Sequence, residues 1–116
     1  MLKLNHKKLE VWKASIELVT DIYRITNSFP ISELYGLVNQ VRRAAISVPS
    51  NISEGAARKS ANERKRFYEI SRSSLSEVDT QLEIAFNLGF IEKDDLLSER
   101  MNYLFALLSN LILKTV

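Results

Sequence analysis

The sequence contains no cysteine, and this absence excludes disulfide bonds and metal sites built on thiolates. Only three glycines and two prolines occur among the 116 residues, which is too few for a fold of many short strands and tight turns. This composition favours long helices. The length is typical of one domain with one core, so we expect a single domain over residues 1–116.

Long hydrophobic runs are also missing. No segment carries the roughly 18 uninterrupted apolar residues that a membrane-spanning helix needs, so no membrane partner is expected. The opening residues, MLKLNHKKLEVWK, lack the apolar core of a signal peptide. Together with the absence of cysteine, these features predict a cytoplasmic protein.

Apolar residues recur at spacings of three and four in four segments, a pattern typical of amphipathic helices, and no stretch alternates with a period of two. Pro30 ends the first segment, Ser60 to Glu63 matches a capping box that opens the third, and Gly89 is a natural stop for it. Because the connections are short, we predict an all-α, antiparallel up-down-up-down four-helix bundle. The expected helices span about 7–27, 33–57, 61–88 and 93–114.

The apolar stripes also predict which helix faces point inward. Trp12 and Tyr23 lie on the expected stripe of the first helix, so both rings are interpreted as packing groups. Tyr68, beside a basic run, is the aromatic residue most available to nucleic acid. The fourth helix is apolar on nearly all sides in LFALLSNLIL, which indicates burial against something outside its own bundle. The expected stripe of the first helix is Leu9, Trp12, Ile16, Val19 and Tyr23.

The second helix contains two unusual features. Ser32 is expected to cap its start, and Pro49 lies inside its apolar stripe, which continues on both sides of the proline. We therefore predict a kink near Pro49 instead of a break. Asn51 and Glu54 are interpreted as polar groups that satisfy the kinked backbone or neighbouring helices, with Arg43 or Arg58 as the partner of Glu54. The whole expected polar cluster is Gln40, Arg43, Asn51, Glu54 and Gly55.

Charge is distributed unevenly along the chain, although the formal net charge is only +2. Between residues 40 and 72 eight Lys and Arg face three Glu, whereas from residue 73 onward three basic residues face seven acidic ones. The basic segment is a candidate surface for RNA or DNA phosphates. From Arg58 to Arg66, ordinary solvated charge explains the pattern equally well. The candidate nucleic-acid-binding residues are Arg42, Arg43, Arg58, Lys59, Arg64, Lys65 and Arg66.

Motifs of catalysis are absent from the sequence. The one histidine, His6, lies near the N-terminus and is expected to be exposed to solvent. The serines between Ser71 and Ser76 have no histidine or lysine base beside them, and Glu-x-x-His pairs and glycine-rich phosphate loops do not occur. We therefore predict a protein that is not an enzyme, with no catalytic residues, no cofactor and no bound metal.

Three segments carry a family resemblance: LEVWKASIELVTDIY, FPISELYGLVNQVRRAAISVPSNISEGAARKSANE, and QLEIA followed closely by LGFI. In this order they resemble the bacterial four-helix-bundle proteins encoded in intervening sequences of 23S ribosomal RNA genes. Ser53 stands where that pattern often has alanine. The resemblance implies a four-helix protomer, a homopentamer and a basic surface that contacts nucleic acid. The sequence is also similar to accessory proteins of diversity-generating retroelements, which bind a reverse transcriptase and nucleic acid.

Two functions remain open at this point. One is a non-enzymatic, pentameric protein that binds nucleic acid through its basic surface. The other is an interaction scaffold, or accessory subunit, that docks a protein partner such as a reverse transcriptase.

Overall fold

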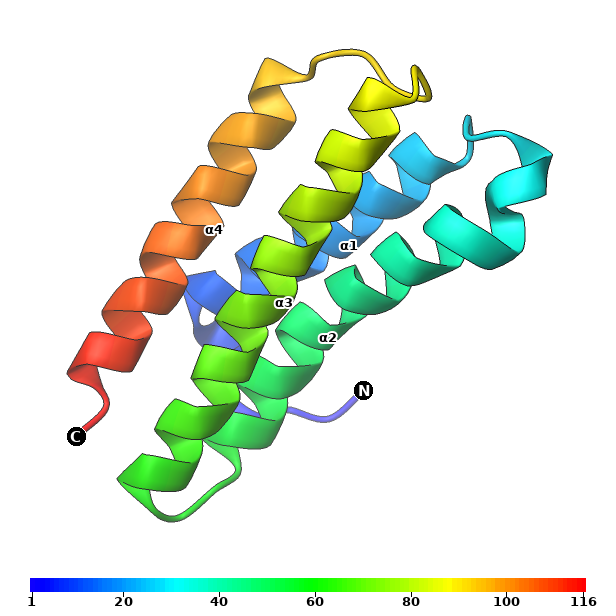
Figure 1. Ribbon diagram of the computed structural model, residues 1–116. Coiled ribbons are helices and arrows are strands. Elements are labelled where there is room, and N and C mark those ends of the chain that lie inside the picture. The colour runs from blue at the N-terminus through cyan, green and yellow to red at the C-terminus, as the bar shows by residue number, and fades with distance from the viewer.

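Four α-helices and no strands make up the fold in the computed structural model, which describes residues 1–116 (Figure 1). This confirms the all-α, four-helix prediction. A 3-10 turn at Asn5–Lys8 precedes the first α-helix, and a 3-10 turn at Ile31–Glu33 and a π-helical turn at Leu34–Val38 precede the second. The helices are α1 (Glu10–Thr26), α2 (Asn39–Ala56), α3 (Ala61–Asn87) and α4 (Asp95–Lys114).

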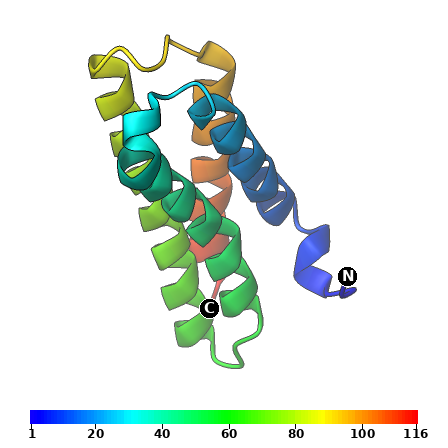
Figure 2. The ribbon, with the colours of Figure 1, turned by 90° about the vertical axis from the view of Figure 1, so that its right-hand side faces the viewer.

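The bundle is elongated, with principal extents of 43 × 26 × 21 Å. The turn between α2 and α3 lies at one end of it, and the connections from α1 to α2 and from α3 to α4 lie at the other (Figures 1 and 2). The turn at the first end follows Ala56 and precedes Ala61, so it is short. Residues on this turn are thus separated by most of the bundle's length from those on the α3–α4 connection.

All four helices contribute to one hydrophobic core. Small residues of α2, Ala44 and Ala45, lie within it, and they allow neighbouring helices to approach closely. Side chains in the middle of the core, such as those of Ile22 and Leu108, are fully buried. The core residues are Val11, Leu18, Ile22, Val41, Ala44, Ala45, Val48, Ile52, Leu75, Val78, Leu82, Leu97, Leu104 and Leu108.

The inward face of α1 differs from the predicted one. Leu9, Ile16 and Tyr23 are each 40% exposed, whereas Val11, Ser15, Leu18 and Ile22 are buried. Ser15 is a polar member of the true inward stripe, and its hydroxyl donates to the carbonyl oxygen of Trp12 at 2.6 Å. Because this hydrogen bond satisfies the hydroxyl, the serine can be buried. The predicted stripe was wrong at Leu9, Ile16 and Tyr23, whereas Trp12 and Val19 pack against the core as predicted.

Side chains cap the starts of α3 and α4 but not those of α1 and α2. Ser60 Oγ accepts from the Glu63 amide at 3.1 Å, and Asp94 caps α4 in the same way. Ser32 makes no capping hydrogen bond. Glu33 caps the π-helical turn Leu34–Val38 by accepting from the Leu37 amide at 3.3 Å, and α2 itself has no side-chain cap. Gly89 follows α3 with a φ of +78°, a backbone conformation that glycine adopts without strain.

Helix α2 continues through Pro49, and polar side chains bond the carbonyl groups beside it. Ser71 Oγ of α3 donates to the Val48 carbonyl oxygen at 2.8 Å, and Asn51 Nδ2 donates to the Ser47 carbonyl oxygen at 2.8 Å. The Ser47 and Ser74 hydroxyls lie 2.9 Å apart across the two helices. A kink at Pro49 stays a prediction. A departure from helical backbone angles occurs earlier, at Gly36.

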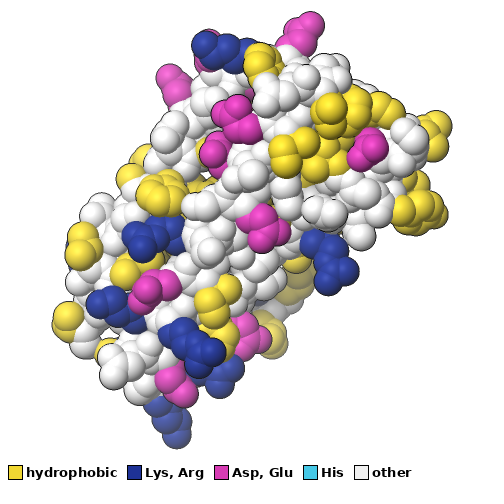
Figure 3. Space-filling view, viewed as in Figure 1, with side chains coloured by type: hydrophobic (Ala, Val, Ile, Leu, Met, Phe, Trp, Pro, Cys, Tyr) yellow, Lys and Arg dark blue, Asp and Glu magenta, His cyan; other side chains and the backbone are white.

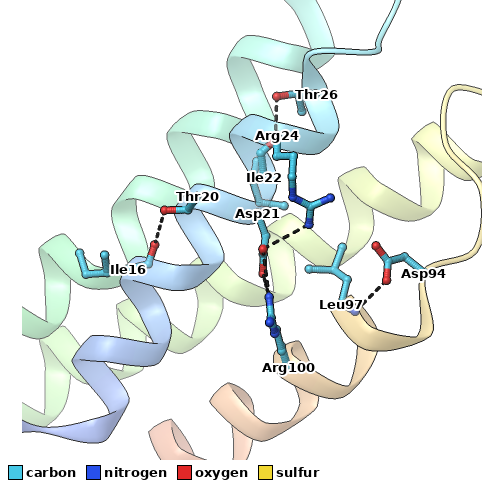
Figure 4. A network of polar contacts seen from close by, with 9 residues as sticks. All are labelled: Ile16, Thr20, Asp21, Ile22, Arg24, Thr26, Asp94, Leu97 and Arg100. Carbon is cyan, nitrogen blue, oxygen red and sulfur yellow. Dashed lines mark hydrogen bonds and ion pairs between the residues drawn. The ribbon is translucent and has the colours of Figure 1, made fainter.

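A buried carboxylate ties α1 to α4. Both oxygens of Asp21 lie 3.1 Å from Arg100 Nη1, and Oδ1 also accepts from Arg24 at 3.3 Å (Figure 4). The Asp21 side chain is 9% exposed, whereas those of Arg100 and Arg24 are 46% and 63% exposed. Solvent therefore screens part of these attractions.

We expect Asp21→Ala to lower the free energy of unfolding by about 1–2 kcal/mol, because it removes the only acceptor that joins these two helices through Arg100. Urea unfolding followed by circular dichroism measures the loss. Asp79→Ala is the matched control, since Asp79 is exposed and forms no ion pair, and it should leave stability nearly unchanged. Equal losses of stability in the two variants would contradict a stabilising role for the contact between Asp21 and Arg100.

Candidate nucleic-acid interface

Five of the predicted basic residues gather where the chain reverses between α2 and α3. We call this group, Arg58, Lys59, Arg64, Lys65 and Arg66, the basic corner. Lys and Arg side chains cluster at the lower end of the molecule in Figure 3, where Figure 1 places this turn. The corner therefore presents several positive charges at one end of the elongated bundle.

Two arginines of the basic corner are engaged within the molecule. Arg58 pairs with Glu54 of the preceding turn at 3.3 Å and lies 4.8 Å from the centre of the Phe67 ring. Arg64 Nη1 donates to the carbonyl oxygens of Lys59 at 2.7 Å and Arg58 at 3.2 Å. These contacts hold the turn closed, so both arginines have a structural role before any ligand arrives.

The other three residues of the corner are free. Lys59, Lys65 and Arg66 are exposed, and none of them takes part in an ion pair or a side-chain hydrogen bond. An exposed cation with no partner in its own chain can neutralise a phosphate without breaking an existing contact. These three residues are the strongest candidates for anion binding.

A shallow depression runs along the exposed side of α3 next to the corner. Asn62 and Ser73 mark its ends, and the helical rise of 1.5 Å per residue gives it a length of about 16 Å. Glu69 is its only acidic group. The lining residues follow one another at helical spacing: Asn62, Lys65, Arg66, Glu69, Ile70 and Ser73.

The family model for the 23S rRNA-intervening sequence protein matches residues 7–110, which include the basic corner and nearly all of the bundle. The chain belongs to this family. Comparison with curated proteins gives no match.

The basic residues of this 23S rRNA-intervening sequence protein do not form one surface. Arg42 lies on α2, sixteen residues before Arg58 on the turn that follows this helix. At the helical rise of 1.5 Å per residue, this separation is about 24 Å. Its Nε donates to Thr26 Oγ1 at 2.8 Å, and its guanidinium group lies 4.4 Å from the centre of the Tyr23 ring. Arg42 thus links α2 to the C-terminal end of α1. Arg43, its neighbour, is exposed and also remote from the corner.

The predicted polar cluster is likewise divided. Asn51 bonds Ser47, and Glu54 pairs with Arg58, one of the two partners considered for it. Gln40 and Arg43 are exposed and belong to neither contact. A glycine, Gly55, is buried where α2 crosses α3. Asn51 thus bonds within α2, Glu54 pairs with a residue of the turn that follows α2, and Arg43 belongs to neither contact.

Tyr68, Tyr23 and His6 take different places from those expected, whereas Trp12 packs against the core as predicted. Tyr68 is only 5% exposed, because it lies on the face of α3 that packs on α2, so it offers no ring to a base. Burial raises the pKa of its hydroxyl, and the nearby charge of Arg64 opposes this effect. Tyr23 is exposed beneath Arg42 instead of packed in the core. His6, expected in solvent, is buried, with its ring 5.6 Å from that of Trp12.

No group of three or more His, Cys, Asp or Glu residues is arranged to hold a metal ion. None of the helices combines the length and the apolar character that crossing a membrane requires.

Among the contacts of the basic corner, the Glu54–Arg58 pair was recognisable in the sequence from its spacing of four residues. The hydrogen bonds from Arg64 to the carbonyl groups of the turn follow from no sequence pattern.

Proposed function

We propose that this protein is a non-enzymatic homo-oligomer that binds nucleic acid through the basic corner. The observation that carries the proposal is the presence of three exposed cations without intramolecular partners, Lys59, Lys65 and Arg66, around one turn. Arg58 and Arg64 add positive charge behind them. Family membership supports the proposal, since the name of the family links these proteins to ribosomal RNA genes.

The dimensions of the depression on α3 suit a strand of nucleic acid. Its length of about 16 Å matches about five nucleotide steps at the 3.4 Å spacing of one strand in B-form DNA. Asn62 and Ser73 supply polar groups near its ends, and the positive end of the α3 dipole lies beside the corner. Contacts of this kind fix phosphates without reading a base sequence, so binding with little sequence preference is expected.

Assembly into a homopentamer is part of the same proposal. Leu113 on α4 is 76% exposed, and such a side chain is suited to a subunit interface. In a closed ring each subunit would repeat the basic corner, and several weak contacts would add up to useful avidity. Analytical ultracentrifugation measures the mass of the assembly directly, and a monomer at micromolar concentration would remove this part of the proposal.

We expect Lys65→Glu combined with Arg66→Glu to weaken binding to RNA and DNA at least tenfold near physiological salt. The plot of log K against log salt has a negative slope. For each phosphate that the variant no longer neutralises, this slope should become less steep by about 0.7 for single strands and 0.9 for duplex DNA. Fluorescence anisotropy with labelled oligonucleotides, recorded at several salt concentrations, measures both quantities. The substitutions avoid Arg58 and Arg64, which support the turn.

The matched control is Lys13→Glu combined with Lys93→Glu. These two residues are exposed and outside the corner, and the net charge changes by the same amount. If the control weakens binding as much as the corner variant, the effect comes from net charge and the corner is not the site. A wild-type protein that binds neither RNA nor DNA would refute nucleic-acid binding altogether.

A second function, docking of a protein partner such as a reverse transcriptase, is favoured by one separate observation. Ile31 and Tyr35, on the connection between α1 and α2, are 90% and 91% exposed, and Leu34 beside them is 45% exposed. An apolar cluster of this kind is typical of a protein interface. Recovery of a stoichiometric protein partner without nucleic acid, on purification from the native host, would favour this function over the first.

A further inference from the structure

A groove between α3 and α4 lies at the end of the bundle opposite the basic corner. It has a volume of about 500 Å³ and runs beside the connection that joins the two helices. We call it the acidic groove. Its main lining residues are Leu75, Asp79, Leu82, Glu83, Phe86, Ile91, Glu92, Leu97, Met101 and Phe105.

The floor of the acidic groove is apolar. Leu75, Leu82 and Leu97 form its buried base, and Phe86 and Phe105 are 49% and 42% exposed at its sides. Aromatic side chains left half-exposed around a concave apolar surface are typical of a binding site for another apolar group. The two half-exposed rings therefore offer hydrophobic contact area that the bundle itself does not use, above a base of core leucines.

The rim of the acidic groove is negatively charged. Asp79, Glu83 and Glu92 lie around the floor, and none of them takes part in the ion pairs of the molecule. Lys93 is the only cation in the lining, and it faces Asp95 at 3.8 Å. The three free carboxylates thus favour a ligand that brings positive charge to the edges of an apolar surface.

We infer that the acidic groove docks an amphipathic helix of a partner protein, with lysine or arginine residues flanking its apolar face. The groove lies between two helices, and it is lined along α3 from Leu75 to Phe86, a length of about 16 Å. A helix of about three turns has this length and places apolar anchors at positions i, i+3, i+4 and i+7. This inference is independent of nucleic-acid binding, because the basic corner lies at the opposite end.

A synthetic peptide of leucine and lysine tests the inference, with leucines at the four anchor positions and lysines on either side of them. The chain contains only two methionines, so a sample labelled at the methionine methyl groups gives two signals. Met101 lines the acidic groove, whereas Met1 is exposed at the terminus and serves as an internal reference. We expect the Met101 signal to shift on titration with the peptide and the Met1 signal to stay in place.

Charge-reversal variants test whether the carboxylates on the rim of the acidic groove contribute to peptide binding. Asp79→Lys combined with Glu83→Lys should weaken peptide binding about tenfold or more, since two attractions become repulsions. Glu69→Lys combined with Glu99→Lys changes the net charge equally outside the groove and should leave the affinity within about twofold. Circular dichroism of the wild type and of both double variants establishes that each protein is folded before binding is compared.

Other outcomes would overturn the inference. Equal binding of a scrambled peptide with the same composition would show that charge alone drives association. A shift of Met101 with a short-chain alkylammonium ion but not with the peptide would identify a small-molecule site. A Met101 signal that changes with protein concentration, in a sample that binds no peptide, would mean that a second copy of the chain fills the groove.

Discussion

Leu108→Ala is expected to lower the free energy of unfolding by about 3 kcal/mol or more. Leu108 has no solvent exposure and lies in the core shared by all four helices. Truncation removes the transfer free energy of three carbon atoms and leaves a cavity that the surrounding helices fill only in part. The midpoint of urea unfolding should fall, while its slope should stay nearly constant if unfolding remains two-state.

Leu113→Ala is the control on the same helix. Leu113 is 76% exposed, so in the isolated chain the same chemical change should cost less than about 0.5 kcal/mol. Measuring both variants at several protein concentrations separates core packing from subunit contacts, because only contacts between subunits depend on concentration. Equal losses at the lowest concentration would show that the inward face of α4 is misassigned.

Gly55→Ala is expected to destabilise the protein by about 2 kcal/mol, although alanine is the better helix former. Gly55 lies where α2 crosses α3. An added Cβ would stand 2.7 Å from Tyr68 Cε1 and 3.0 Å from Phe67 Cβ. Phe67 Cβ is attached directly to the α3 backbone, so relief requires the two helices to move apart. Thermal or urea unfolding followed by circular dichroism measures the loss.

Two companion variants make the Gly55 experiment specific. Ser50→Ala, at an exposed position of α2 without a side-chain hydrogen bond, should be neutral or slightly stabilising. In a Tyr68→Ala background, which removes the nearest ring atoms, Gly55→Ala should cost clearly less than it does in the wild type. If Gly55→Ala instead stabilises the protein as Ser50→Ala does, the close approach of α2 and α3 is not the reason for glycine at this position.

Periodicity and capping residues predicted the helices, because these signals act within one or two turns of the chain. Ser60 starts α3 as its capping box predicts, and Gly89 has the positive φ typical of a helix end. The segment Leu34–Val38 was expected to be helical from its apolar spacing. It forms a π-helical turn instead, with Gly36 outside helical backbone angles.

The inward faces and the partners of charged groups were harder to predict, because they depend on which helices meet. The inward face of α1 was mispredicted because it contains a polar residue, Ser15. Its hydroxyl bonds a carbonyl group of its own helix and therefore packs like a small apolar group. The sequence indicates a surface cation at Arg42, yet its side chain bonds Thr26, sixteen positions earlier. Asp21 and Arg100 are separated by 79 residues, a contact that no local pattern reveals.

The closed turn between α2 and α3 has a thermodynamic consequence for the basic corner. Because Arg64 bonds two carbonyl groups of the turn, and because Lys65 and Arg66 stand on the first turns of a long helix, the backbone beneath the free cations is already ordered. A ligand that meets them need freeze only side-chain rotamers, about 0.5–1.5 kcal/mol for each long side chain. The corner is thus preorganised, and in the proposed complex the nucleic acid would be the partner that loses more flexibility.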